Sequence, residues 1–328
     1  MEIIRKKVDV PVLMIFFNRP ETFRRVFEQV RKAQPTVLYL YQDGAREGRD
    51  DDIANIQKCR KIVENVDWEC EVHRLYQEKN YGCDPSMYLA IRWFFNRVDR
   101  GIILEDDVVP AVSFFGFCKE LLDKYATDER IATISGMNHL KEYRPEGSRA
   151  DYFFAHASSI WGWATWRRFV DQWDVKYNFL DSQEKVALIK NNFLESKVMK
   201  SDRVRFDLFI EKCWEHRKTG VEHFESLVSS TRYINNQLGI FPCENMISNI
   251  GYEGESTHGA TTIKLLPKTS KRVFNIPRTE KTFPLNHPTC VDASDRYLFK
   301  KEKLMTATIW SYPFRWIESK IRYILFGK

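Results

Sequence analysis

Short apolar runs and amphipathic stretches alternate along the first third of the chain. Residues 10–17, 36–41 and 102–104 are mostly apolar and have the length of strands that are buried on both faces. Between them, residues 51–66 carry apolar side chains at the three- and four-residue spacing of a helix packed against a core. This alternation predicts a Rossmann-like α/β fold, in which helices flank a mostly parallel sheet.

The pattern continues beyond residue 110. Residues 114–125 have helical spacing, and residues 131–136 form another apolar run that can be a strand. Residues 180–200 are predicted to be a polar helix without a recognisable motif. Four prolines are spread through residues 260–300, which we interpret as a tail that wraps the core.

Three consecutive carboxylates, Glu105, Asp106 and Asp107, end the apolar run at 102–104, and Pro110 stops its continuation. Carboxylates this close together repel one another unless a divalent cation or several amide donors neutralise them. They would also lie at the carboxyl end of a parallel strand, where open α/β sheets bind their ligands. The alternative is an acidic turn that only solvates the end of the strand.

Two other predicted strands also end in polar residues. Arg19 follows the first strand and precedes Pro20, which suits the first turn of a helix. Its guanidinium would then lie beside amide groups that favour an anion, and the alternative is an ordinary surface arginine. Asp43 and Gly44 follow the second strand. An Asp-Gly pair there is either a plain turn or a carboxylate offered to a sugar or a base.

The composition and one missing motif argue against two classes of protein, those that bind nucleic acids and the dinucleotide-dependent oxidoreductases. With 328 residues and 43% hydrophobic content, the chain can bury a large core. Its net charge of +6 combines 51 basic with 45 acidic residues, a bias too weak to imply a nucleic-acid partner, and we expect none. The first strand is not followed by Gly-x-Gly-x-x-Gly, which argues against a dinucleotide-dependent oxidoreductase.

Cysteine usage and hydropathy bear on the compartment. The seven cysteines are scattered and never spaced as Cys-x-x-Cys, which predicts a reducing cytosol and no zinc module. We expect no signal peptide, and no segment is long and apolar enough to span a bilayer. The sequence therefore predicts a cytoplasmic protein.

Five short motifs follow the predicted strands and helices. They are Asn18-Arg19-Pro20-Glu21-Thr22-Phe23-Arg24-Arg25, Gln42-Asp43-Gly44, Asn80-Tyr81-Gly82, Leu104-Glu105-Asp106-Asp107-Val108-Val109-Pro110 and Ser113-Phe114-Phe115. Together they resemble the motifs of nucleotide-sugar glycosyltransferases with the GT-A fold. The similarity is to the N-acetylglucosaminyltransferase I type and to related bacterial sugar transferases of surface-polysaccharide assembly, and it covers most of residues 10–260.

The resemblance implies a role for each matching position. Arg19 would meet the diphosphate, Asp43 would meet the uracil, and Asp107 would bind the metal directly. Glu105 and Asp106 would face the ribose and the donor sugar. The implied cofactor is Mn²⁺ or Mg²⁺, a Lewis acid that stabilises a diphosphate leaving group. The implied donor is a nucleoside-diphosphate sugar, with a UDP-sugar favoured.

The same resemblance implies a division of the chain. Residues 1–260 would form the GT-A domain, with a nucleotide-binding half at 1–110 and an acceptor half at 111–260. Residues 261–328 would form a C-terminal helical extension, made of the wrapping tail and an amphipathic helix.

Trp161, Gly162 and Trp163 begin the run Trp-Gly-Trp-Ala-Thr-Trp-Arg-Arg. In the resembling bacterial transferases, this run lines the donor-sugar and acceptor side of the cleft. Indole faces stack on sugar rings, and a glycine allows close approach. The alternative is that these tryptophans belong to the core.

Phe224 and Glu225 match positions at which the relatives usually have Trp-Asp, whose acid is the general base of an inverting transfer. Glutamate still provides the carboxylate, on a side chain that is one methylene longer. The alternative is an acid that only favours the start of a helix, and Glu222 is the nearest competitor for the catalytic role. His258, in a glycine-rich stretch that suits a lid, is assigned to a metal or phosphate, with a structural histidine as the alternative.

Residues 309–326 alternate aromatic side chains with arginine and lysine at helical spacing. Such a helix can lie on an anionic membrane surface, so we expect the protein to be peripheral on the inner face of the membrane. The alternative partners of this helix are its own domain and a second subunit.

These observations predict a metal-dependent, inverting glycosyltransferase that moves a sugar from a nucleoside-diphosphate sugar to a glycan or a lipid-linked saccharide. A nucleotidyltransferase is the alternative enzyme, and it would be expected to have a glycine-rich phosphate loop after the first strand. The alternative from another class is a non-catalytic carbohydrate-binding protein on the same fold.

Overall fold

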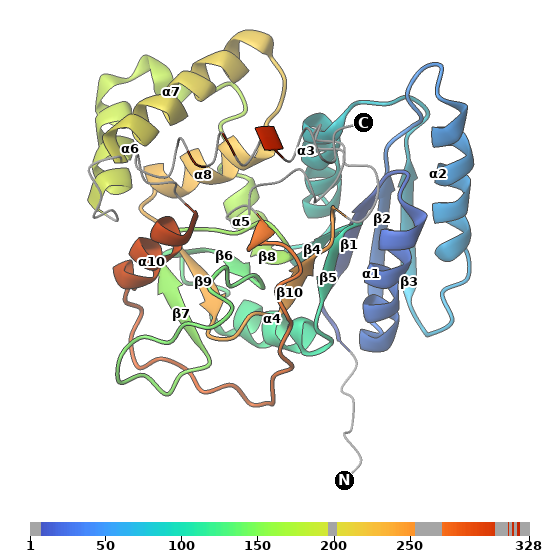
Figure 1. Cartoon of the computed structure of the whole chain (residues 1–328), viewed down its shortest axis with the longest axis horizontal. Helices are drawn as coiled ribbons and strands as arrows, with labels where there is room; N and C mark the ends of the chain where they lie inside the picture. Colours follow the sequence, from blue (N-terminus) through green and yellow to red (C-terminus); the bar gives the residue numbers. More distant parts are fainter. Residues whose placement is uncertain are drawn as a thin grey trace.

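The computed structural model describes residues 8–195, 202–252 and 271–305, together with the single positions 314, 317, 320 and 321. Strands and helices alternate from the start, and Figure 1 shows their arrangement. The strands are β1 (Val12–Phe16), β2 (Val37–Gln42), β3 (Glu71–Tyr76), β4 (Arg100–Glu105), β5 (Val108–Pro110), β6 (Ile131–Ser135), β7 (Tyr152–Ala155), β8 (Trp163–Trp166), β9 (Leu238–Pro242) and β10 (Ile247–Asn249). The helices are α1 (Pro20–Ala33), α2 (Asp50–Ile62), α3 (Cys83–Phe95), α4 (Ser113–Lys124), α5 (Arg167–Val170), α6 (Gln183–Glu195), α7 (Asp202–Thr219), α8 (Phe224–Ile234) and α10 (Asp295–Met305), with a 3-10 turn at Asn178–Asp181.

Eight of these strands form one sheet, in the order β3-β2-β1-β4-β8-β6-β9-β7. Strand β1 is central to the first half and runs parallel to both β2 and β4. Strand β8 is antiparallel to its neighbours β4 and β6. Four of the seven neighbouring pairs are parallel, so the predicted α/β fold with a mostly parallel sheet is confirmed.

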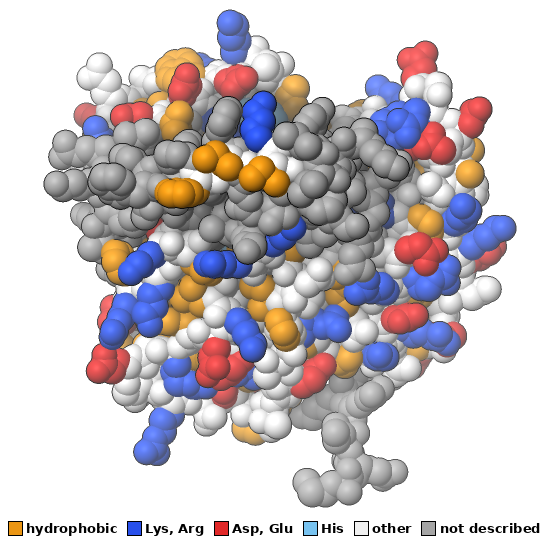
Figure 2. All heavy atoms as spheres, viewed as in Figure 1, with side chains coloured by type: hydrophobic (Ala, Val, Ile, Leu, Met, Phe, Trp, Pro, Cys, Tyr) orange, Lys and Arg blue, Asp and Glu red, His pale blue; other side chains and the backbone are white. Residues whose placement is uncertain are grey.

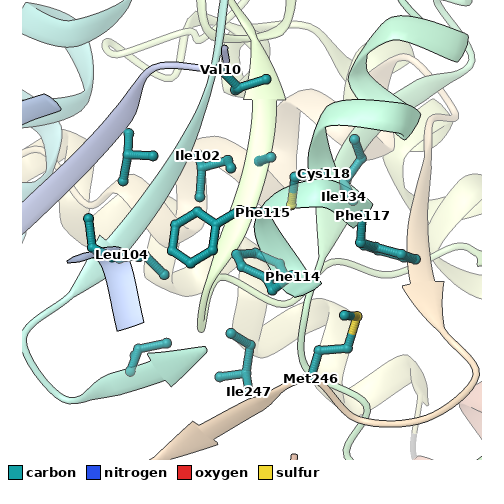
Figure 3. Packing of buried hydrophobic residues seen from close by; sticks show 14 of the residues in the cluster. Val10, Ile102, Leu104, Phe114, Phe115, Phe117, Cys118, Ile134, Met246 and Ile247 are labelled. Carbon is teal, nitrogen blue, oxygen red and sulfur yellow. The ribbon is translucent and has the colours of Figure 1, made fainter. Parts of the chain in front are cut away.

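The sheet is covered on both faces. Successive side chains of a strand point to opposite sides, and both sets pack into apolar clusters. In β1, Val12 and Met14 belong to one apolar cluster, whereas Leu13 and Ile15 belong to another. Helices α1, α2 and α4 contribute to the first cluster, part of which is drawn in Figure 3. Helices α3, α5, α6, α7 and α8 contribute to the second. The protein therefore has three layers, with the sheet between two helical layers.

Residues 271–305 run from beside β10 to α10 and pack against this sandwich (Figure 1). Ile276 and Leu285 are buried in the first apolar cluster. The Glu280 carboxylate accepts hydrogen bonds from the backbone N–H groups of Val112 and Ser113, at 3.0 and 2.7 Å, and so caps the beginning of α4. The predicted domain boundary at residue 260 lies outside the described residues and stays a prediction.

Candidate functional site

The three acidic residues lie in a tight connection between two strands. Glu105 is the last residue of β4, and Asp106 and Asp107 form the turn into β5. Strand β5 pairs with β10 in a small antiparallel sheet. The N–H of Ile250, just beyond β10, donates a 2.8 Å hydrogen bond to the backbone carbonyl of Asp107. Backbone contacts on this side therefore hold the acidic turn in place.

The loop between β1 and α1 reaches the same turn. The N–H of Phe17 donates to Asp106 Oδ2 at 3.1 Å. Arg19 Nη1 donates to Asp107 Oδ2 at 3.0 Å and lies 3.9 Å from Asp106 Oδ1. Because β1 and β4 are parallel neighbours, their carboxyl ends bring a cation and the acidic cluster together.

The carboxylates of this turn have an unfavourable electrostatic environment. Burial raises the pKa of Asp106 to about 7, the charge of Asp107 adds to this effect, and Arg19 opposes it. Burial also raises the pKa of Glu105 well above its usual range, and Asp107, Asp106 and Glu225 contribute. Glu105 Oε1 is buried and has no hydrogen-bond partner among the described residues. The cluster would therefore gain from a proton or a cation.

Within the described part of the chain, no group of three or more His, Cys, Asp and Glu side chains is arranged to hold a metal ion. A metal at this turn would need ligands beyond the described side chains, such as phosphate oxygens and water. His258, the second predicted metal ligand, lies outside the described residues.

Asp43 lies at the end of β2 and is buried. Its carboxylate accepts hydrogen bonds from the side chain of Asn80 at 2.9 Å and from the backbone N–H groups of Gly44, Tyr81 and Gly82 at 3.0, 3.0 and 3.1 Å. Burial raises the pKa of Asp43, and the backbone donors oppose this. The side chain thus fixes the turn at residues 80–82, and its contact with a base stays a prediction.

The predicted aromatic run separates into two environments. Trp163 is completely buried in the core on β8, opposite Ile103 of β4. Trp161 is only half-buried. Gly162 between them has a φ of +64°, and a Cβ there would lie 2.5 Å from Cδ1 of Ile247, so β10 can approach only a glycine. The roles assigned to the three residues in sugar binding stay predictions.

Trp161 continues into a row of rings that the sequence did not indicate. Its ring centroid lies 5.3 Å from that of Phe274 and 5.9 Å from that of His139. Phe274 in turn contacts Tyr252 at 4.1 Å. Burial raises the pKa of Tyr252, and Asp107 raises it further, which places this ring near the acidic turn. The row therefore leads from Trp161 towards Asp107.

Glu225 lies in the first turn of α8 and is exposed. Its charge contributes to the raised pKa of Glu105, so the two carboxyl groups are close enough to interact. Glu222 precedes the helix and is half-buried. Of the predicted candidates for a base, Glu225 is the one whose electrostatic effect on the acidic turn is resolved.

A buried carboxylate behind the site was missed. Asp52, in the first turn of α2, is completely buried and accepts hydrogen bonds from Asn18 Nδ2 at 2.6 Å and from Arg46 Nε at 2.7 Å. The Arg46 guanidinium also lies 5.6 Å from the centre of the Phe17 ring. Asp52 thereby joins the loops that follow β1 and β2. The sequence shows only a run of three aspartates at the start of this helix. The run does not indicate which aspartate points into the core.

No protein-family model matches the chain, and no curated protein matches it. One similar solved structure is UDP-glucose pyrophosphorylase complexed with UDP-glucose. Its TM-score is 0.35 and its sequence identity is 8%, over 72% of this chain and 91% of that chain. Similarity at this level does not assign a function, so we base the function on the geometry of the site.

Proposed function

We propose that the protein is a transferase that binds a nucleoside-diphosphate sugar at the carboxyl ends of β1 and β4. The observation that carries this proposal is the pairing of Arg19 with Asp107, at 3.0 Å, beside two carboxyl groups with raised pKa values. A divalent cation brings the positive charge that such a site lacks, and the cation together with Arg19 would attract a diphosphate. Arg19 would contact the diphosphate, and Glu105 and Asp106 would face the ribose and the donor sugar.

Asp107 fits a role in holding Mn²⁺ or Mg²⁺. Its carboxylate is a hard oxygen ligand, the type that both ions prefer, and the neighbouring Glu105 oxygen is buried without a partner among the described residues. When bound, the ion would act as a Lewis acid on the diphosphate leaving group. His258 is proposed as a further metal or phosphate ligand.

Glycosyl transfer is the reaction that we favour, with Glu225 as the general base. The residue is exposed and interacts electrostatically with Glu105, so an acceptor hydroxyl could approach both it and the donor sugar. Direct attack by that hydroxyl inverts the anomeric centre. The half-buried Trp161 and its neighbours Phe274 and Tyr252 supply apolar faces for a sugar ring at the same end of the molecule. Asp43 would contact the base.

Carboxylates and a bound metal ion would suit a nucleotidyltransferase equally well. The reaction products therefore have to distinguish the two enzymes. We would incubate the protein with a panel of sugar nucleotides and Mn²⁺, with and without saccharide acceptors and pyrophosphate. A glycosyltransferase releases a nucleoside diphosphate, whereas a nucleotidyltransferase forms a nucleoside triphosphate from pyrophosphate. A carbohydrate-binding protein forms neither product, and that result would overturn the proposal.

The Glu225→Gln variant tests the assigned base. A positioned base is worth roughly 10²–10⁴-fold in rate, so turnover should fall within this range while UDP binding persists. Glu222→Gln is the companion variant, because Glu222 is the competing candidate for the base and should keep near-normal turnover if Glu225 holds that role. Near-normal turnover of Glu225→Gln would remove this residue as the base. Retention of the donor's anomeric configuration in the product, determined by NMR, would exclude the inverting mechanism.

The proposed lipid-linked acceptor and the proposed position on a membrane both depend on the amphipathic segment at residues 309–326. Phe314, Ile317 and Ile321 are three and four residues apart and are exposed by 74, 47 and 50%. Exposed apolar side chains are visible in the upper part of Figure 2, with Lys and Arg side chains nearby. No helix among the described residues could cross a membrane. A peripheral position on an anionic membrane, with a lipid-linked acceptor, fits this surface.

Co-sedimentation with anionic vesicles at low salt tests the membrane proposal. The full chain should sediment with the vesicles, and a chain that ends at residue 308 should sediment less while it hydrolyses donor normally. A full chain that stays in the supernatant would contradict membrane binding without affecting the proposed reaction.

A further inference from the structure

The start of α8, where Glu225 stands, is attached to α3 through a histidine. His223 is the residue before the helix, and its carbonyl accepts the N–H groups of Ser226 and Leu227, each at 3.1 Å. Its ring Nδ1 lies 3.1 Å from Oδ2 of Asp84, in the first turn of α3. The Asp84–His223 contact therefore joins two helix beginnings beside the acidic turn, two residues before the proposed base.

A second histidine lies face to face with the first. The His216 ring, in the last turn of α7, stacks on His223 with centroids 3.5 Å apart and an interplanar angle of 26°. His216 is buried, and the Tyr177 ring lies 6.1 Å from it. Burial lowers the pKa of His216, and His223 lowers it further. Two imidazoles in this contact resist carrying charge at the same time.

Other charged groups also face this pair. Lys212 on α7 opposes protonation of His216, whereas Glu215 on α7 and Asp84 on α3 favour it. Glu222 is the neighbour of His223 in the chain. Asp84 lies 3.1 Å from Nδ1 of His223 and is a carboxylate that faces the pair. A proton on His216 would place a positive charge in the buried stack, where Lys212 also opposes it.

We propose that the contact between Asp84, His223 and His216 positions Glu225, and that protonation of His216 opens the α7–α8 junction and withdraws Glu225 from the acidic turn. The inference rests on the proposed function, in which Glu225 is the general base. His223 and Asp84 are positioning residues, because they act on the reaction through Glu225.

Variants of His223 test the positioning. His223→Ala should lower kcat at pH 8 by about tenfold or more, because a shift of about 1 Å in a catalytic group can cost 10²-fold in rate. The KM for the donor should hardly change. His223→Gln keeps a donor for Asp84 and should restore part of the loss. In a Glu225→Gln background, His223→Ala should have no further effect, as expected for residues that act as one unit.

The pH profile tests the second half of the proposal. His216→Phe keeps an aromatic ring in the stack and cannot be protonated, so the acidic fall of kcat should move to lower pH by at least about half a unit. The matched control is His73→Gln. His73 also lies beside a carboxylate, 2.8 Å from Glu71, and stacks on Tyr39 at 4.4 Å, but on the outer strand β3. Its profile should equal that of the unmodified chain.

The outcomes separate this inference from the function on which it rests. If sugar nucleotides are turned over, but His223→Ala stays fully active or His216→Phe keeps the original acidic limb, only the positioning device is overturned. If the unmodified chain turns over no sugar nucleotide, both the proposed function and the positioning role of the histidines are overturned. Thermal melts of each variant at pH 8 distinguish a misfolded protein from a misplaced Glu225 side chain. His223→Gln should melt at the same temperature as the unmodified chain and still have a lower kcat.

Discussion

Two carboxylate sites lie at the same edge of the sheet, and their surroundings differ. Asp43, after β2, accepts hydrogen bonds from three backbone N–H groups and one side-chain amide. Glu105 and Asp106, after β4, share a turn with a third carboxylate, and one Glu105 oxygen is buried without a partner among the described residues. A carboxylate with its donors in place stabilises the fold before any ligand binds, whereas one that lacks them gains most from a ligand.

The largest effect should follow a change in the incompletely neutralised site. Asp107→Asn keeps the shape of the side chain and removes its charge, so metal-dependent UDP affinity should fall by at least about 100-fold, because a charged ligand to the metal is lost. The melting temperature should change little, since the turn is also held by the backbone bond from Ile250. Calorimetry with UDP and Mn²⁺ measures the affinity. Asp51→Asn, on the surface of α2, is the control and should bind UDP normally. If Asp107→Asn keeps its affinity for UDP and Mn²⁺, Asp107 is not the metal ligand.

The opposite result is expected at the satisfied site. Asp43→Ala leaves the N–H groups of Tyr81, Gly82 and Gly44 without their acceptor, so the free energy of unfolding should fall by about 3 kcal/mol. Asp43→Asn keeps one acceptor oxygen and should lose about half as much. Urea denaturation monitored by circular dichroism gives both values. A fully stable Asp43→Ala variant that binds UDP weakly would show that this carboxylate serves the ligand and not the fold.

A smaller effect concerns the pH dependence of stability. The pKa of Asp106 is raised from 3.8 to about 7, so the folded protein binds more protons than the unfolded chain between these values. The contribution of this group to the free energy of unfolding therefore falls as pH rises from about 4 to 7. Asp106→Asn removes this cost and should be more stable than the unmodified chain at pH 8, by on the order of 1 kcal/mol, with no gain at pH 4.

Thermal melts in a chelator at several pH values measure this difference. Added Mg²⁺ should raise the melting temperature of the unmodified chain more at pH 8 than at pH 5, because the cation binds ionised carboxylates. Equal melting curves for Asp106→Asn and the unmodified chain at every pH would show that the acidic turn is as well neutralised as Asp43.

The sequence predicted the alternating strands and helices in the first half of the fold, and it placed Arg19 and the three acidic residues each after a strand. Both follow from local patterns, since apolar runs mark strands and the carboxyl ends of parallel strands meet at one edge. It did not predict α7, whose apolar residues follow no helical periodicity, or α10. It also did not indicate that Asp43 would find all its donors locally.

The remaining features of the site depend on contacts between distant segments. Asp52 is buried only because Asn18 and Arg46 reach it from two different loops. Phe274 meets Trp161 only because residues 271–305 pack against the sandwich. The stacking of His216 on His223 likewise depends on the angle between α7 and α8. Single-sequence patterns contain no information about such packing.

The pairing of β5 with β10 has a consequence for the order in which the protein assembles during translation. Residues 108–110 leave the ribosome long before residues 247–249, so the acidic turn lacks its antiparallel partner while most of the chain is being made. The same is true of Ile276 and Leu285, which fill the apolar cluster beneath the turn from still later positions. A nascent chain would therefore expose charged and apolar surfaces together until residues 247–249 and 276–285 emerge. The acidic turn would then be fully supported only after residues 276 and 285 have been made.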